Sequence, residues 1–187
     1  MDLSNAFQGA AMAIDPAELI ETPSGEDRLR SSLEREPISA LQLGPAIAVS
    51  AGATLKEAVE NLQEHHIGCV LVSGPDGRLQ GIFTERDLLN RVAGRKLDWS
   101  QCRVADFMTR DPESLRPADR IVWALNLMHM GGYRHVPLVD EDNRPVGVIS
   151  VKDIVEFIVE LMPAAVLNLP PDPHRAPSND EDPGGTD

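Results

Sequence analysis

Two short polar sequences, 66 residues apart, have the residue types and the spacing to bind a ligand. They are Thr84-x-x-Asp87 and Ser150-x-x-Asp153. In one interpretation each is a capping box, in which a hydroxyl and a carboxylate satisfy free backbone N–H groups at the start of a helix. In the other, the same helix start attracts a phosphate, and the carboxylate accepts hydrogen bonds from a ribose diol. These residues alone leave both interpretations open.

Basic side chains near the two sequences are suited to phosphate. Arg86 and Lys152 occupy the same position in the two copies, and Arg134 and His135 precede a short apolar run in the second copy. A cationic side chain forms strong, short hydrogen bonds with phosphate oxygens. The alternative for each is a solvated side chain without a ligand. The first copy has Gly68-Cys69 where the second has Arg134-His135.

Other kinds of site lack the residues they need. His65 and His66 are adjacent, so on a helix they point apart, and no third ligand follows at a suitable spacing. We therefore expect no metal site. No nucleophile–base set and no glycine-rich phosphate loop occurs. We therefore expect that the chain is not an enzyme and needs no obligatory cofactor.

Composition narrows the class of protein. The 187 residues are 42% hydrophobic, which is enough for a core, and carry a net charge of −13. This charge argues against nucleic acid and anionic membranes as partners. No apolar stretch approaches the length of a membrane span. The first residues show no basic region followed by an apolar one, so we expect no signal peptide and a cytoplasmic protein. Cys69 lies in an apolar run and is expected to be buried.

The 66-residue offset extends far beyond the two polar sequences and predicts two copies of one unit. Without a gap it aligns the apolar runs, the turns and the final aspartates of the two copies. Each copy reads as an extended segment, a helix, two strands joined by a tight turn, and a second helix. The predicted elements are residues 46–50, 54–62, 69–73, 79–83 and a helix from 84 in the first copy, and 113–115, 119–128, 136–139, 145–149 and 150–161 in the second.

Local signals place the boundaries of these elements. Thr54 begins a capping box with Glu57, and Asp119 is placed to cap the equivalent helix of the second copy. Gly77 and Asn143 tolerate the positive φ that tight hairpin turns need. Apolar spacing then predicts the buried stripes of the four helices. These stripes are Leu55, Val59 and Leu62; Ile121, Leu125 and Met128; Leu88, Leu89 and Val92; and Ile154, Val155, Ile158 and Leu161.

The two ends of the chain differ from the middle. Residues 1–37 form an N-terminal extension that we expect to be partly ordered, with a weak helix over 7–20 and a turn over 22–25. Residues 163–187 are rich in proline, glycine and acidic residues. Such a composition cannot build a core, so we expect this tail to be disordered.

The repeated pattern resembles a known family. A strand, a hairpin and Gly-h-h-[Ser/Thr]-x-x-Asp-[Leu/Ile] followed by a helix, all occurring twice, look like a tandem pair of CBS domains, a Bateman module. The runs Gly131–Asp140 and Val104–Thr109 are similar to two further signatures of that family. The resemblance covers about residues 38–162. The first copy departs from it at Leu71, where the second has Pro137.

The resemblance implies a fold and a function. The fold is α/β (α+β-like), with two βαββα repeats, at 38–97 and 98–162, packed about a pseudo-two-fold axis that leaves two clefts. The clefts bind AMP, ADP, ATP or S-adenosylmethionine as a regulatory ligand, with Asp87 and Asp153 on the ribose and Thr84 and Ser150 on the ribose or phosphate. It also implies a homodimer, with an unidentified protein partner. The alternatives are a ligand-free dimerisation scaffold and, less favoured, an enzyme subunit with catalysis elsewhere.

Overall fold

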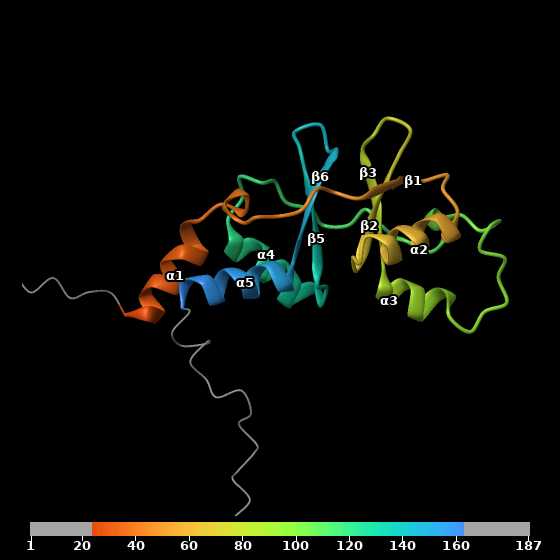
Figure 1. The fold of residues 1–187 in the computed structure, drawn as a ribbon. Coiled ribbons are helices and arrows are strands. Elements are labelled where there is room, and N and C mark those ends of the chain that lie inside the picture. Colours follow the sequence, from red (N-terminus) through yellow and green to blue (C-terminus); the bar gives the residue numbers. More distant parts are fainter. Residues whose placement is uncertain (1–23, 163–187) are drawn as a thin grey trace, which may run out of the picture.

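The two halves of the chain repeat one succession of elements, as the 66-residue offset predicts (Figure 1). The structure is a computed structural model that describes residues 24–162. The helix expected over 7–20 and the tail expected to be disordered lie outside these residues. The first half contains η2 (Ile38–Ala40), β1 (Ala48–Ser50), α2 (Leu55–Glu64), β2 (Cys69–Ser73), β3 (Leu79–Thr84), α3 (Glu85–Asp87) and η3 (Leu88–Val92). The second contains η4 (Val104–Asp106), β4 (Thr109–Arg110), α4 (Ile121–Gly131), β5 (His135–Val139), β6 (Pro145–Ser150) and α5 (Val151–Leu161).

Most local signals in the sequence are confirmed. The Thr54 hydroxyl accepts from the Glu57 backbone N–H at 3.2 Å, and the Glu57 carboxylate accepts from the Thr54 N–H at 2.7 Å. The hairpin turns use positive φ at Gly77 (+79°) and Asn143 (+63°). Cys69 is buried, and burial raises the pKa of its thiol to about 12. This thiol therefore stays neutral.

The prediction that Asp119 caps α4 is wrong. The residue before α4 is Arg120, which makes no side-chain cap. The Asp119 carboxylate instead accepts from the backbone N–H of Arg116 at 2.7 Å. The free N–H of Ile121 is satisfied by the carbonyl of Glu36, at 3.1 Å. The carbonyl of Glu36, which is distant in sequence, thus satisfies one of the free N–H groups at the start of α4.

The helix stripes need three corrections. Leu89 is 69% exposed, Val155 is 51% exposed and Leu161 is 36% exposed. Leu89 lies in η3, where the Ala93 N–H bonds to the Leu88 carbonyl in the wider spacing of a π-helix. This wider turn rotates side chains away from the directions that a 3.6-residue period predicts. In α5 the stripe is narrower than predicted, and Ile154 is its buried centre.

The structure contains one helix that the sequence did not predict, α1 (Gly25–Arg35), which starts at the last residue of the turn predicted over 22–25. It begins at a capping box between Ser24 and Asp27. Its Leu33 packs against the core of the second repeat. Among residues 24–162, no helix is long and apolar enough to cross a membrane.

The leading segments of the two repeats are exchanged. Ile38 lies at the start of the first repeat but is fully buried in the core of the second, beside Ile121 and Val136. Val104 lies near the start of the second repeat but is fully buried in the core of the first. In the same way β4 pairs antiparallel with β3, which gives a sheet of order β1-β2-β3-β4. The two repeats therefore cannot fold as independent units.

The two hairpins meet in a third apolar cluster. Figure 1 shows β2–β3 and β5–β6 standing side by side. Cys69, Leu71 and Ile82 of the first hairpin pack there with Val139 and Val148 of the second. This contact places the last residue of β3 and the start of α3 near the first residue of β5 and the loop before it. These segments lie between the two repeats.

The exchange predicts that truncation of Ile38 destabilises the second repeat. Ile38→Ala removes a fully buried side chain and should cost about 2–5 kcal/mol in the free energy of unfolding. Urea denaturation measures the cost, and hydrogen exchange should show the lost protection in α4 and β5. Ser39→Ala, at an exposed neighbour, is the control. Loss of protection confined to residues 46–92 would contradict the exchange.

Candidate functional site

A pocket opens between the two repeats, and both contribute to its wall. Its volume is about 160 Å³, well above the roughly 10–15 Å³ that one water requires. Apolar side chains form one part of the lining and charged side chains the other. The lining residues are Gly68, Ile82, Thr84, Glu85, Arg86, Asp87, Thr109, Pro112, Glu113, Tyr133, Arg134, His135 and Pro137.

The structure brings together most, but not all, of the residues that the sequence singled out. Thr84, Arg86 and Asp87 of the first repeat line this pocket with Arg134 and His135 of the second. Ser150, Lys152 and Asp153 do not line it. They stand in the second repeat at the positions of Thr84, Arg86 and Asp87 and belong to the start of α5.

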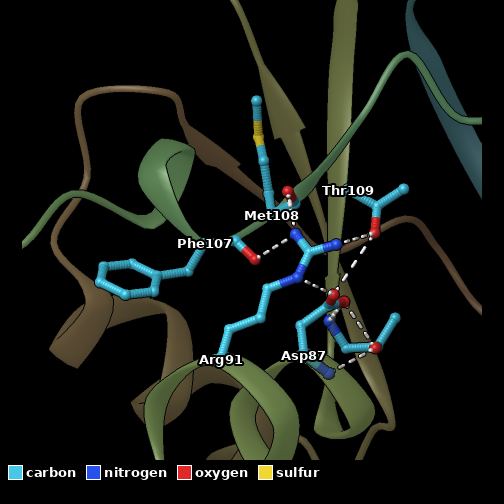
Figure 2. A network of polar contacts seen from close by, with 6 residues as sticks. Asp87, Arg91, Phe107, Met108 and Thr109 are labelled. Atoms are coloured by element: carbon cyan, nitrogen blue, oxygen red, sulfur yellow. Dashed lines mark hydrogen bonds and ion pairs between the residues drawn. The ribbon is translucent and has the colours of Figure 1, made fainter. Parts of the chain in front are cut away.

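Asp87 is the buried polar centre of the pocket wall and is only 8% exposed. Its Oδ2 accepts from the Thr84 backbone N–H at 3.0 Å and from the Thr84 hydroxyl at 2.7 Å. Its Oδ1 accepts from the Thr109 hydroxyl at 3.3 Å and forms an ion pair with Arg91 Nε at 3.4 Å (Figure 2). Thr84 and Asp87 therefore form a capping box, and the Asp87 carboxylate also contacts Thr109 and Arg91 outside it.

The equivalent carboxylate of the second repeat has fewer partners. Asp153 Oδ2 accepts from the Ser150 N–H and hydroxyl, both at 2.6 Å. Leu43 stands at the repeat position of Thr109, and Phe157 at that of Arg91. Lys152 pairs with Glu156 at 3.4 Å, and its side chain is 81% exposed. The two polar sequences are thus alike in the chain but differ in their surroundings.

Basic side chains reach the pocket from both repeats. Arg86 donates from Nη1 to the carbonyl of Gly132 at 2.7 Å, which ties α3 to the loop before β5. Arg134 lies in that loop and is exposed. The His135 imidazole occupies space that Gly68 leaves free, since a Cβ on residue 68 would lie 2.9 Å from the ring. The glycine of the first copy therefore accommodates the histidine of the second.

Sequence reasoning missed four residues of this site: Thr109, Arg91, Glu113 and Tyr133. Thr109 is the last residue of the run Val104–Thr109, which resembles a family signature in the sequence. Only the pairing of β4 with β3 places its hydroxyl beside Asp87. The Tyr133 hydroxyl donates to Glu113. The Tyr133 ring lies against Gly131, where a Cβ would come within 2.0 Å of it. No signal in the sequence pairs Tyr133 with Glu113. Within residues 24–162 no cluster of side chains is able to hold a metal ion.

The environment of His135 disfavours its charge. Burial lowers the pKa of His135 below its ordinary value of 6.5, and Arg134 lowers it further, while Glu85 and Asp153 act in the opposite direction. Because the unfolded chain then binds the proton more readily than the folded chain, the free energy of unfolding should fall as the pH drops through and below 6.5. Elevated pH restores this contribution.

His135→Gln should therefore lose part of the acid sensitivity of folding. The measurement is the urea midpoint between pH 7 and pH 5, in the wild type and in the variant. His129→Gln, at an exposed position on α4, is the control and should retain the wild-type dependence. An unchanged pH dependence in His135→Gln would show that other groups cause the effect.

Comparison with known proteins agrees with the repeat and the fold. The family model for the CBS domain matches residues 38–94 and 104–160, more than half of the chain. An uncharacterized 17.7 kDa protein from Acidianus ambivalens is 26% identical over 124 residues, covering 66% of this chain and 74% of that protein. This chain spans only 21% and 53% of two CBS domain-containing proteins of Arabidopsis thaliana that it also matches.

Solved structures show the same architecture. The CBS-domain containing protein ATU1752 from Agrobacterium tumefaciens has 35% identity and a TM-score of 0.54, covering 60% of this chain and 88% of its own. The CBS domain protein PAE2072 from Pyrobaculum aerophilum, solved in complex with AMP, has 26% identity and a TM-score of 0.60, covering 67% and 97%. With two matched copies that share one register and one fold, this chain belongs to the CBS-domain family as a tandem pair.

Proposed function

We propose that this protein is a regulatory module that binds one adenine nucleotide in the pocket between its repeats. The observation that carries the proposal is the joint lining of this pocket by a buried carboxylate, Asp87, and by cationic side chains from both repeats, Arg86 and Arg134. A carboxylate suits the hydroxyls of a ribose, and guanidinium groups suit phosphate. A nucleotide contains both.

Each part of a nucleotide has a suitable part of the wall. The ribose fits Asp87 and Thr109, whose hydroxyl can turn from the carboxylate to a ligand. The phosphates fit Arg134, Arg86 and the start of the helical segment after Thr84. The base fits the apolar wall of Ile82, Pro112, Pro137 and the Tyr133 ring, since aromatic and apolar groups dominate small-molecule pockets.

Phosphate-bearing ligands suit this pocket better than S-adenosylmethionine. The sulfonium of S-adenosylmethionine carries a positive charge, which Arg86 and Arg134 repel, although Glu85 and Glu113 line the same pocket. ADP and ATP bring negative charge to the same place. The AMP complex of the similar Pyrobaculum aerophilum protein supports an adenine nucleotide as the ligand class. The preference among AMP, ADP and ATP is the quantity to measure.

A regulatory role follows from where the pocket lies. Its walls come from two repeats that share cores and strands. A ligand that contacts Arg86 and Arg134 together changes the relative free energies of the arrangements of the two repeats. Such a shift is a signal that a partner protein can detect.

We propose a single nucleotide per chain. The surroundings of Asp153 offer Leu43 and Ile47 at the repeat positions of Thr109 and Glu113, and Gly68 at that of Arg134. A phosphate there lacks the cationic partner that Arg134 provides in the other cleft. Calorimetric titration should give a stoichiometry near one, and a stoichiometry of two would count against this assignment.

Arg134→Ala should weaken ADP and ATP more than adenosine. Losing a charge-assisted hydrogen bond costs roughly 1.5–3 kcal/mol, or about tenfold to a hundredfold in affinity. Adenosine has no phosphate and should lose little. Lys152→Ala removes an equivalent charge outside the pocket and is the matched control. Isothermal titration calorimetry measures all three ligands, and equal losses for each would mean that Arg134 is structural.

The competing function, a dimerisation scaffold without a ligand, is favoured by one observation. The outer face of α4 exposes Trp123 (54%) and Met130 (76%), two turns apart. A second copy of the chain that covers this face would form a homodimer. Ile158, Val159 and Met162, at the end of α5 and just after it, are half-buried and offer less apolar surface to a second copy.

Trp123→Glu should therefore give a monomer in multi-angle light scattering if the wild type is a dimer formed through α4. A wild type that is monomeric at tens of micromolar protein, with and without ADP, would contradict the homodimer. Wild-type protein that shows no thermal shift with any adenine nucleotide would favour the scaffold over the sensor.

A further inference from the structure

We infer that Arg91 is a positioning residue that prepares the ribose end of the pocket by holding Asp87 and Thr109 in one fixed arrangement. Arg91 does not line the pocket. It reaches both residues from outside the pocket wall and fastens them to the segment Phe107–Thr109, near the start of the second repeat. The inference rests on the proposed function, because it concerns how the ligand's ribose is recognised.

The contacts of the Arg91 guanidinium carry the inference. Nη1 donates to the carbonyls of Phe107 at 2.9 Å and Met108 at 2.6 Å. Nη2 donates to the Thr109 hydroxyl at 3.5 Å, and Nε pairs with Asp87 Oδ1 at 3.4 Å. Figure 2 shows one planar group joining the segment Phe107–Thr109 to the carboxylate. Few side chains other than arginine offer several donors in such a rigid fork.

These contacts set the direction of the hydrogen bonds at the pocket wall. With Arg91 donating to it, the Thr109 hydroxyl oxygen serves as acceptor, so its own hydrogen is directed to Asp87 Oδ1. A ribose hydroxyl that takes over this hydrogen bond finds Asp87 Oδ1 already oriented as an acceptor and the Thr109 hydroxyl already in position. Pre-organisation of this kind lowers the entropic cost of binding.

The backbone at Arg91 is adapted to this reach. Arg91 lies in the π-helical turn Leu88–Val92, not in an ordinary helical turn. Single π-helical turns are rare and often occur at functional sites. The second repeat has an uninterrupted α5 at the same place, with Phe157 packed on its core. The π-turn and the arginine therefore occur together, in the repeat whose aspartate lines the pocket.

The test measures how much the ribose hydroxyls contribute to binding. In the wild type, ADP should bind at least about tenfold more tightly than 2′,3′-dideoxy-ADP, since two hydrogen bonds to a charged acceptor are lost. In Arg91→Met this ratio should fall to about twofold or less, because the acceptor is no longer held, while affinity for the dideoxy ligand stays nearly constant. A purely structural role would weaken both ligands equally.

Arg110→Met is the matched control. Arg110 also donates to a backbone carbonyl, that of Ala105 in η4, at 2.9 Å, but it does not hold Asp87. It should keep the wild-type ratio. If Arg91→Met does not fold, Arg91→Lys replaces it, and its ratio should fall at least about threefold, because lysine lacks the planar fork.

The outcomes separate this inference from the proposed function. A wild type that binds no adenine nucleotide overturns the proposed function and the inference with it. A wild type that binds ADP without preferring the ribose hydroxyls overturns the role of Asp87. A wild-type ratio that is retained in Arg91→Met overturns the positioning role of Arg91 alone.

Discussion

The antiparallel pairing of β4 with β3 is the constraint on which the site depends. It sets Thr109 opposite Ile82 and Arg110 opposite Gly81, so the segment that opens the second repeat is an edge strand of the first. Gly81 is needed there, because a Cβ would lie 2.3 Å from the sulfur of Met108. Without this pairing, Asp87 would keep only partners from its own repeat, Thr84 and Arg91.

The burial of Asp87 shows what this pairing makes possible. Removing a carboxylate from water costs several kcal/mol unless hydrogen bonds and an opposite charge compensate. Four donors from Thr84, Thr109 and Arg91 provide that compensation. Each carboxylate oxygen of Asp87 already accepts from two donors. An asparagine at residue 87 would replace one of these oxygens with an NH₂ group, whose hydrogens would face donors and find no acceptor. The same contacts thus serve the cap, the joining of the repeats and the proposed ribose site.

Duplication gave the two repeats one backbone plan, and side-chain differences gave them different roles. Position by position, the pocket has Thr109, Arg91, Tyr133 and Arg134 where the other repeat has Leu43, Phe157, Ile67 and Gly68. The first set is polar or amphipathic and lines or supports a cavity. The second set is apolar or lacks a side chain. An aspartate in a shared motif therefore says less about ligand binding than the groups around it.

The sequence by itself determined the elements and their repetition. Capping boxes at Thr54, Thr84 and Ser150 and the turn residues Gly77 and Asn143 act within a few residues, so their physics is contained in local sequence. The resemblance of the motifs to tandem CBS domains then indicated the family and five of the lining residues: Thr84, Arg86, Asp87, Arg134 and His135.

The tertiary structure alone decided which of the two motifs lines the pocket. Asp119 lost its expected role as a cap because α4 begins one residue later, after Arg120, and the Asp119 carboxylate accepts from Arg116. The start of α4 receives instead a carbonyl from Glu36, which is distant in sequence. Leu89 is exposed because the π-turn alters the helical period. Thr109 meets Asp87 and Arg91 because the leading segments are exchanged between repeats. Contacts of this kind join residues that no local pattern connects, and they arise only when the two cores close together.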